Sequence, residues 1–189
     1  MEGDKYKKDI EITCEVFEEI SYIRSVLENS GFHYVEEFTL DDIYLSNCNT
    51  KQFVPKDGKI TDTLIIRYVN ENDKKIICKQ RNYDEKGFEI STDKSVLRIE
   101  NIEDAERLFN MLGYVRYLRM IDKNYRYESD NCIAYIQEVA NLGTFLELEA
   151  KNKEITAKQL VSYLQSFPLK TGTKFDVRKA EMLYKKIGE

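Results

Sequence analysis

The chain of 189 residues has few of the residues that break or cross-link a fold. Only 2 prolines and 8 glycines occur, which excludes collagen-like and low-complexity chains. There are 4 cysteines and 1 histidine, with no CxxC pair, so a zinc site is not expected. No apolar run approaches the roughly 18 residues of a membrane span. The first eight residues lack the apolar segment of a secretory signal, so we expect a cytoplasmic protein with no membrane partner.

Neither sign of charge dominates the composition. The 29 Lys and Arg residues and 34 Asp and Glu residues give a formal net charge of -5. This balance argues against duplex nucleic acid as a partner, because duplex binders present a basic face. It leaves open a small polyphosphate ligand in a locally basic pocket. Neither GxxxxGK[ST] nor GxGxxG occurs, so a phosphate site would have to consist of side chains.

Three cysteines fall within apolar strand patterns, and without a secretory signal a reducing compartment and free thiols are expected. We therefore predict that Cys14, Cys78 and Cys132 are small core residues. A cysteine nucleophile would have to use His33 as its base. That residue follows a predicted helix end in a polar stretch, and we expect it at the surface.

Hydrophobic periodicity predicts an α+β chain that forms a single domain over 1–189, with a core at about 9–150 and C-terminal helices within 156–187. Strands are expected at 9–15, 62–70, 74–81, 87–92, 115–127, 131–139 and 144–150, with extended stretches leading to 41–45 and a polar loop at 46–61. Four helices are expected. The first has Val16, Ile20, Ile23 and Leu27 on one apolar stripe and ends at Gly31. The second runs from Asn101 to Gly113, the third is capped by Thr156 and ends before Pro168, and the fourth lies at about 175–186.

The chain contains a weak internal repeat. Each half runs helix, glycine, aromatic residue, strand and then an aliphatic-Asp-x-x-Tyr step, first from Gly31 to 40–44 and then from Gly113 to 121–125. Two such halves fit a closed or nearly closed antiparallel sheet. We therefore predict an eight-stranded antiparallel β barrel, or tunnel, flanked by helices.

Several strands alternate charged with apolar residues. One interpretation places the charged faces in solvent, as on most half-buried sheets. The other points them into one lumen, where bases would neutralise phosphate oxygens and carboxylates would hold Mg²⁺. The acids of such a lumen are Asp9, Glu11, Glu147 and Glu149, and its bases are Arg67, Lys79, Arg119 and Lys123. Arg81 follows Lys79 by two residues in the same predicted strand. Its side chain would therefore point into the same lumen, or lie exposed at the end of the strand.

In these segments the chain resembles the CYTH family, also called triphosphate tunnel metalloenzymes, which includes class IV adenylyl cyclases and thiamine triphosphatases. Residues 139–149, VANLGTFLELE, are similar to the V-x-x-LG-x-F-x-E-x-E strand pair of that family. Residues 9–13 stand at the opening ExExK strand, 42–45 at the D-x-Y-L step, and 64–67 and 76–79 at the two basic strands. The segment 102–114 resembles the connecting helix of the class IV cyclases.

The chain departs from the family pattern at several positions. Thr13 stands where the opening motif has Lys, and Asp9 replaces its first Glu. Gln137 stands at the metal-binding Asp before the LG turn, and Tyr125 replaces the Arg of a KxR pair, for which Arg126 or Arg119 could substitute. The resemblance thus leaves two interpretations open: a diverged enzyme with a rebuilt metal site, or a tunnel that has lost its chemistry.

The resemblance implies a metal-dependent nucleotidyl cyclase or triphosphatase that acts on a nucleoside or other triphosphate with Mg²⁺ or Mn²⁺. The alternatives are a catalytically degenerate module that binds nucleotide or polyphosphate, and a plain structural domain. A homodimer stays open. The implied metal ligands are Asp9, Glu11, Glu147 and Glu149, and the implied phosphate ligands are Arg67, Lys79, Arg119 and Lys123. Glu89 is expected to bind substrate or pair with a base, and Glu11, Lys79 and Lys123 are the implied catalytic residues.

Overall fold

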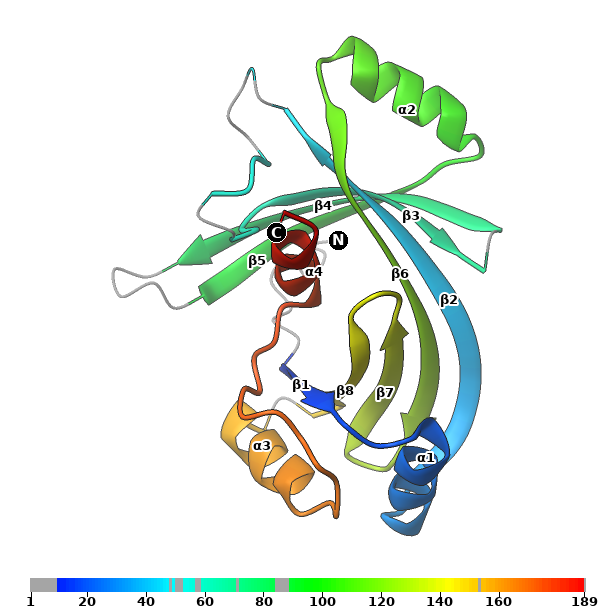
Figure 1. Ribbon diagram of the computed structural model, residues 1–189, viewed down its shortest axis with the longest axis vertical. Helices are drawn as coiled ribbons and strands as arrows, with labels where there is room; N and C mark the ends of the chain where they lie inside the picture. The colour runs from blue at the N-terminus through cyan, green and yellow to red at the C-terminus, as the bar shows by residue number, and fades with distance from the viewer. Residues whose placement is uncertain are drawn as a thin grey trace, which may run out of the picture. The chain divides into compact units, whose positions relative to one another are not determined.

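The computed structural model describes residues 10–47, 49, 53–56, 59–70, 72–83, 89–152 and 154–188. These described residues form an eight-stranded antiparallel sheet and four helices, in the strand order β1-β8-β7-β6-β2-β3-β4-β5 (Figure 1). The strands are β1 Glu11–Val16, β2 His33–Ser46, β3 Thr63–Val69, β4 Asp73–Tyr83, β5 Glu89–Arg98, β6 Val115–Glu128, β7 Cys132–Val139 and β8 Gly143–Ala150. The helices are α1 Ile20–Asn29, α2 Ile102–Met111, α3 Ala157–Gln165 and α4 Lys179–Gly188. The α+β class and the eight antiparallel strands predicted from the sequence are confirmed.

The chain divides into two compact units. The first contains Thr39–Ile121 and Ala180–Glu189, and the second contains Asp9–Phe38 and Asp122–Lys179. Among the described residues no pairing joins the end strands β1 and β5. Closure of the sheet into a barrel therefore stays a prediction, as does the single domain.

Local sequence signals explain where the helices begin and end. Asn101 accepts hydrogen bonds from the first-turn N–H groups of α2, and Thr156 forms a capping box with Gln159 at α3. Gly31 and Gly113 have φ of 86° and 85°, and each ends its helix in a Schellman motif. The N–H groups of the aromatic residues that follow them bond to carbonyls five residues earlier, at 3.0 and 2.9 Å. The repeat of helix, glycine, aromatic residue and long strand is thus present.

The core of the second unit lies between one face of β1, β8, β7 and β6 and the helices α1 and α3. Cys14, Leu146 and Ile136 occupy matching positions on the three neighbouring strands, and each is 0% exposed. Leu27 of α1 and Leu164 of α3 are buried in the same cluster. This face is the apolar half of the alternation seen in the sequence, so charged residues occupy the other face.

The first unit has one core on each side of its strands. On one side Ile43, Leu64 and Ile66 pack with Ile102 of α2. On the opposite side α4 lies over the sheet, where Tyr184 contacts Tyr117 with ring centroids 5.6 Å apart. Tyr117 in turn contacts Tyr44 of β2, at 6.1 Å. Burial raises the pKa of the Tyr117 phenol well above its ordinary value.

Four sequence-based boundaries were wrong, and each has a physical reason. Val16 belongs to β1 and not to the helix, because its apolar spacing reflects the buried face of a strand. β5 extends to Arg98 because its ladder with β4 continues through a stretch of exposed residues. The extended stretches before 41–45 form one strand, β2. The last helix starts at Lys179 instead of 175, because Phe175 and Val177 bond to the backbone of β1.

The aliphatic-Asp-x-x-Tyr step of the predicted repeat is not equivalent in the two halves. Tyr44 lies opposite Ile65, on the same face of the sheet as Asp42. Its ring contacts Tyr117, on the side of the sheet that α4 covers. Tyr125 instead packs in the apolar core of the second unit. Counted from the two glycines the step differs by one residue, and a shift of one residue turns a strand side chain to the other face.

The cysteine and histidine predictions hold for the described residues. Cys14 and Cys132 are buried free thiols, and Cys78 packs at the edge of the other core. Burial raises the pKa of Cys14 to about 12. His33 is exposed.

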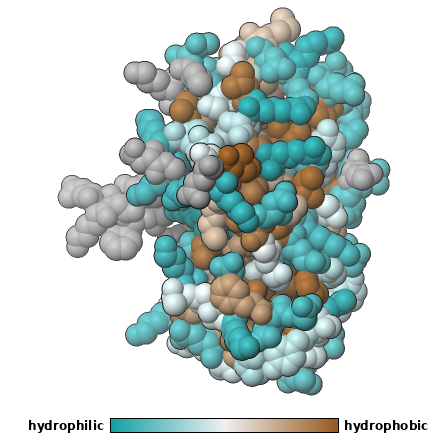
Figure 2. All heavy atoms as spheres, in the orientation of Figure 1, coloured by the Kyte–Doolittle hydropathy of each residue, from teal (hydrophilic) through white to brown (hydrophobic). Residues whose placement is uncertain are grey.

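None of the helices that the structure describes is long and apolar enough to cross a membrane. In Figure 2 hydrophilic residues cover most of the visible face, with hydrophobic ones in scattered groups.

Candidate functional site

One face of β2–β5 in the first unit concentrates basic side chains. Directly opposed residues of an antiparallel pair project from the same face, and the register sets Lys75 between Arg67 and Arg98. It likewise sets Lys79 opposite Lys94. We call this surface the basic face: its described bases are Arg67, Lys75, Lys79, Arg81, Lys94 and Arg98, and its described acids are Asp42 and Asp73.

A buried ion pair anchors the basic face at β2 and β3. Arg67 donates from Nε and Nη2 to the two carboxylate oxygens of Asp42, both at 2.6 Å. The Asp42 side chain is 0% exposed, so its charge depends on this partner for compensation. The fork-like contact fixes the plane of the guanidinium. At the same end, a hydrogen bond from Lys75 lowers the pKa of Asp73.

The other end of the basic face carries Lys79 and Arg81. Lys79 is half-buried and lies opposite Thr63. Arg81 follows on the same face, and its Nη1 donates to the carbonyl oxygen of Thr61 at 2.5 Å. Its backbone N–H donates to Asp62 at 3.2 Å. The structure thus places Arg81 beside Lys79, with the guanidinium held against the segment before β3.

The second unit carries a polar face that is mainly acidic. The register sets Glu11 opposite Glu149 and Thr13 opposite Glu147. Thr13 Oγ1 donates a hydrogen bond to Glu147 Oε2 at 3.2 Å. We call this surface the acidic face: its described polar residues are Glu11, Thr13, Glu15, Asp122, Asn124, Arg126, Glu128, Tyr135, Gln137, Glu147 and Glu149.

A lysine from the C-terminal segment lies on the acidic face. Residues 170–177 run along the second edge of β1, where Thr13 N–H donates to Phe175 O at 3.0 Å and Val177 N–H donates to Thr13 O at 3.1 Å. This pairing brings Lys179 to the face. Its Nζ donates to Gln137 Oε1 and lies 3.6 Å from Glu147 Oε2. The Lys179 and Glu147 side chains are only 14% and 18% exposed.

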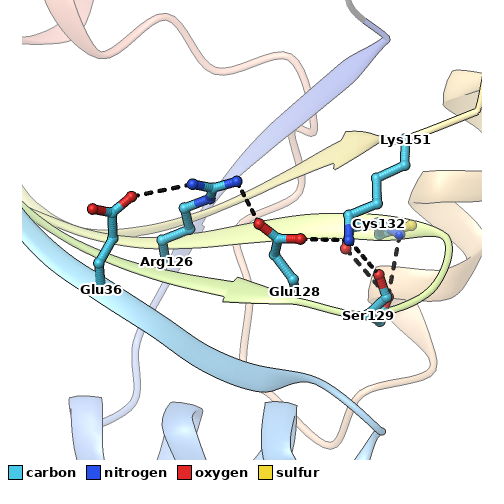
Figure 3. A network of polar contacts seen from close by, with 6 residues as sticks. All are labelled: Glu36, Arg126, Glu128, Ser129, Cys132 and Lys151. Atoms are coloured by element: carbon cyan, nitrogen blue, oxygen red, sulfur yellow. Dashed lines mark hydrogen bonds and ion pairs between the residues drawn. The ribbon is translucent and has the colours of Figure 1, made fainter.

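A chain of ion pairs continues from the acidic face along β6 (Figure 3). Arg126 Nη1 lies 3.1 Å from Glu36, and its Nη2 donates to Glu128. Glu128 also pairs with Lys151 at 2.5 Å, and that hydrogen bond lowers the pKa of the Glu128 carboxyl. Lys151 donates further to the carbonyl oxygen of Ser129 at 2.8 Å. Two acids therefore hold Arg126 on the acidic face. Arg126 is one of the two residues considered above as substitutes for the missing Arg of the KxR pair.

Some of the predicted site residues come together and others do not. Arg67 and Lys79 share the basic face, and Glu11, Glu147 and Glu149 share the acidic face. Asp9 lies outside the described residues. Glu89 is in β5 opposite Tyr83, and its side chain lies outside the described part of the structure.

Arg119 and Lys123 lie on other surfaces. Arg119 makes a two-pronged contact, at 2.9 and 2.7 Å, with Asp41, whose side chain points away from the face of Asp42. Lys123 lies over the Tyr125 ring at 4.9 Å and pairs with Glu37 at 3.3 Å, on the core side of β6. The polar-face positions of that strand are Asp122, Asn124 and Arg126.

The residues that the structure describes do not form a ready-made site for a divalent cation. No group of three His, Cys, Asp or Glu side chains able to hold a metal occurs among the described residues. Glu147 already faces an ammonium group and a hydroxyl, and the neutral amide of Gln137 is a weaker ligand for Mg²⁺ than a carboxylate. As arranged, the part of the acidic face around Glu147 and Gln137 fits a lysine ammonium and not Mg²⁺ or Mn²⁺.

Comparison with known proteins gives a fold and no closer relative. The chain matches no protein-family model, and no curated protein matches it in sequence. A candidate adenylate cyclase from Vibrio parahaemolyticus superposes with a TM-score of 0.65 at 14% identity, covering 96% of this chain and 98% of that one. HpAC1 from Hippeastrum, a candidate adenylyl cyclase with a dominant triphosphatase activity, superposes at 0.64 and 12% identity over 95% and 96%. The chain has a CYTH-like fold.

Proteins with this CYTH-like fold also include PH1012 from Pyrococcus horikoshii OT3. Its TM-score is 0.71 at 18% identity, over 93% of this chain and 99% of that one. Each comparison covers nearly the whole of both chains. At these identities the likeness establishes the fold alone.

Proposed function

We propose that this chain binds the triphosphate group of a nucleotide or another organic triphosphate at the basic face. The observation that supports this most directly is the two groups of bases on one face of β3, β4 and β5. One group is Arg67, Lys75 and Arg98, and the other is Lys79 with Lys94. Each charge-assisted contact to a phosphate oxygen is worth roughly 1.5–3 kcal/mol. A triphosphate presents several such oxygens along one line, which suits bases repeated along neighbouring strands.

The CYTH-like fold supports the same ligand class, since HpAC1 shares the fold and has triphosphatase activity. The chain itself lacks a glycine-rich phosphate loop, so side chains must do the binding. Arg67 is oriented for this role by the buried Asp42. Arg contributes a planar fork of donors and Lys a compact charge, and both types are present.

The test is calorimetric titration with inorganic tripolyphosphate, ATP and AMP. We expect tripolyphosphate and ATP to bind more tightly than AMP, because each additional phosphate adds charge-assisted contacts. Equal affinity for all three, or no binding of any, would refute a triphosphate site.

An enzyme is the second candidate, favoured by the direct opposition of Glu11 and Glu149 across β1 and β8. Two carboxylates in register supply oxygen ligands of the kind that Mg²⁺ and Mn²⁺ take. Incubation with ATP and either metal distinguishes the alternatives. Cyclic AMP with pyrophosphate would identify a cyclase, and inorganic phosphate a triphosphatase. Clear ATP binding without any product would leave a binding module.

A further inference from the structure

We infer that the Lys179 ammonium supplies the positive charge that a divalent cation would otherwise supply at the acidic face. The part of that face around Glu147 and Gln137 then binds Mg²⁺ or Mn²⁺ only weakly while Lys179 is present. The inference goes beyond the proposed function and concerns the acidic face alone. It follows from three observations: the contacts of Lys179, the identity of residue 137, and the backbone that carries the lysine.

The contacts of Lys179 are those of a resident cation. Its Nζ donates to Gln137 Oε1 and faces Glu147 Oε2 at 3.6 Å. A lysine ammonium has three donors and one positive charge, so a single lysine compensates the single charge of Glu147. A divalent cation that used Glu147 would have to approach this ammonium, and like charges at such distances repel.

Gln137 fits the same interpretation. It is 5% exposed and lies directly opposite Asn124 and Phe145. A neutral amide oxygen accepts a hydrogen bond from Lys179 without adding a second negative charge. A carboxylate at this position would leave one charge uncompensated by the lysine and would attract a further cation. Gln137 and Lys179 therefore form a matched pair.

The position of Lys179 is fixed by backbone structure. The segment before it is tied to β1 by hydrogen bonds at Thr13, and a further bond joins Gly172 N–H to Glu15 O at 2.9 Å. The lysine is also the first residue of α4. Because this backbone is already ordered, little further conformational entropy is lost when the ammonium contacts Gln137 and Glu147.

The experiment measures Mn²⁺ binding by calorimetry in the absence of phosphate. In the wild type we expect Mn²⁺ binding to be weak, because Lys179 already contacts Gln137 and Glu147. In Lys179→Met and in Gln137→Asp/Lys179→Met, Mn²⁺ affinity should rise by about tenfold or more. Lys179→Arg should behave as the wild type, because it keeps the charge.

Lys174→Met is the matched control, since Lys174 is an exposed lysine of the same segment. Unchanged Mn²⁺ affinity in both Lys179→Met variants would overturn the inference. If Lys179→Met is unstable, Lys179→Gln, which also removes the positive charge, replaces it in the same titration.

Discussion

Arg67 contacts both carboxylate oxygens of Asp42 at 2.6 Å, and the Asp42 side chain has no exposure to solvent. Breaking a buried pair on one side leaves a charge without compensation, which costs roughly 3–5 kcal/mol. We therefore expect Arg67→Ala to destabilise the protein by about that amount in urea unfolding. This differs from the effect expected of a base that only binds phosphate, so Arg67→Ala alone does not report on ligand affinity.

The double variant Asp42→Leu/Arg67→Met supplies the control for that prediction. Replacing both partners by apolar residues of similar volume removes the uncompensated charge, and we expect the double variant to be more stable than Arg67→Ala. Equal stability of Arg67→Ala and the wild type would show that the ion pair does not compensate Asp42.

Lys79 provides the cleaner test of phosphate binding. Lys79→Ala removes one charge-assisted contact of roughly 1.5–3 kcal/mol and should weaken tripolyphosphate binding by about 10- to 150-fold. Lys74→Ala is the matched control, because Lys74 lies on the same strand and pairs with Tyr68 on the opposite face. Circular dichroism should show both variants folded. A loss of affinity as large in Lys74→Ala would remove the basis for assigning the basic face.

The buried thiols should be inert in the native protein. The thiolate is the nucleophile, and burial raises the pKa of Cys14 to about 12, so almost none is ionised at neutral pH. Iodoacetamide labelling read by mass spectrometry should leave Cys14 and Cys132 unmodified until denaturant is added. Labelling of Cys14 in the native state, at the rate seen in denaturant, would contradict its place in the core.

Glu128 should give stability a defined pH dependence. The hydrogen bond from Lys151 lowers the pKa of Glu128 in the folded state. A depressed carboxyl pKa stabilises the fold above the unfolded value of about 4.3, and this contribution is lost as pH falls through the folded pKa. Lys151→Met should therefore lower Tm at neutral pH, and the difference from the wild type should shrink in acid. Lys158→Met on α3 is the control, and a pH-independent difference would argue against this ion pair.

The start of α2 and α3 and the end of α1 and α2 could be predicted because their causes are local. Asn101 and Thr156 cap helices with side chains that reach only two or three residues along the chain. Gly31 and Gly113 adopt positive φ within the turn that they form. Such signals act before any long-range contact exists, so they can be read from the order of residues alone.

Strict alternation made the faces of β1 and β8 predictable, but β6 was ambiguous. In β1 and in residues 146–149 of β8 one parity is apolar and the other polar, so burial of the apolar side sends Glu11, Glu147 and Glu149 to one face. In β6 both parities contain polar and aromatic or aliphatic residues. Only its register with β7 decides that Arg126 lies on the polar face and Lys123 on the other.

By itself, then, the sequence determined the α+β class, the eight strands, the helix caps and the charged faces of the regularly alternating strands. Tertiary structure decided the partners of those charges. Asp42 meets Arg67 only through the pairing of β2 with β3, and Lys179 meets Gln137 only because 170–177 pairs with β1. The reason is physical: local propensity acts over a few residues, whereas a charge selects its partner through contacts between segments that are distant in the chain.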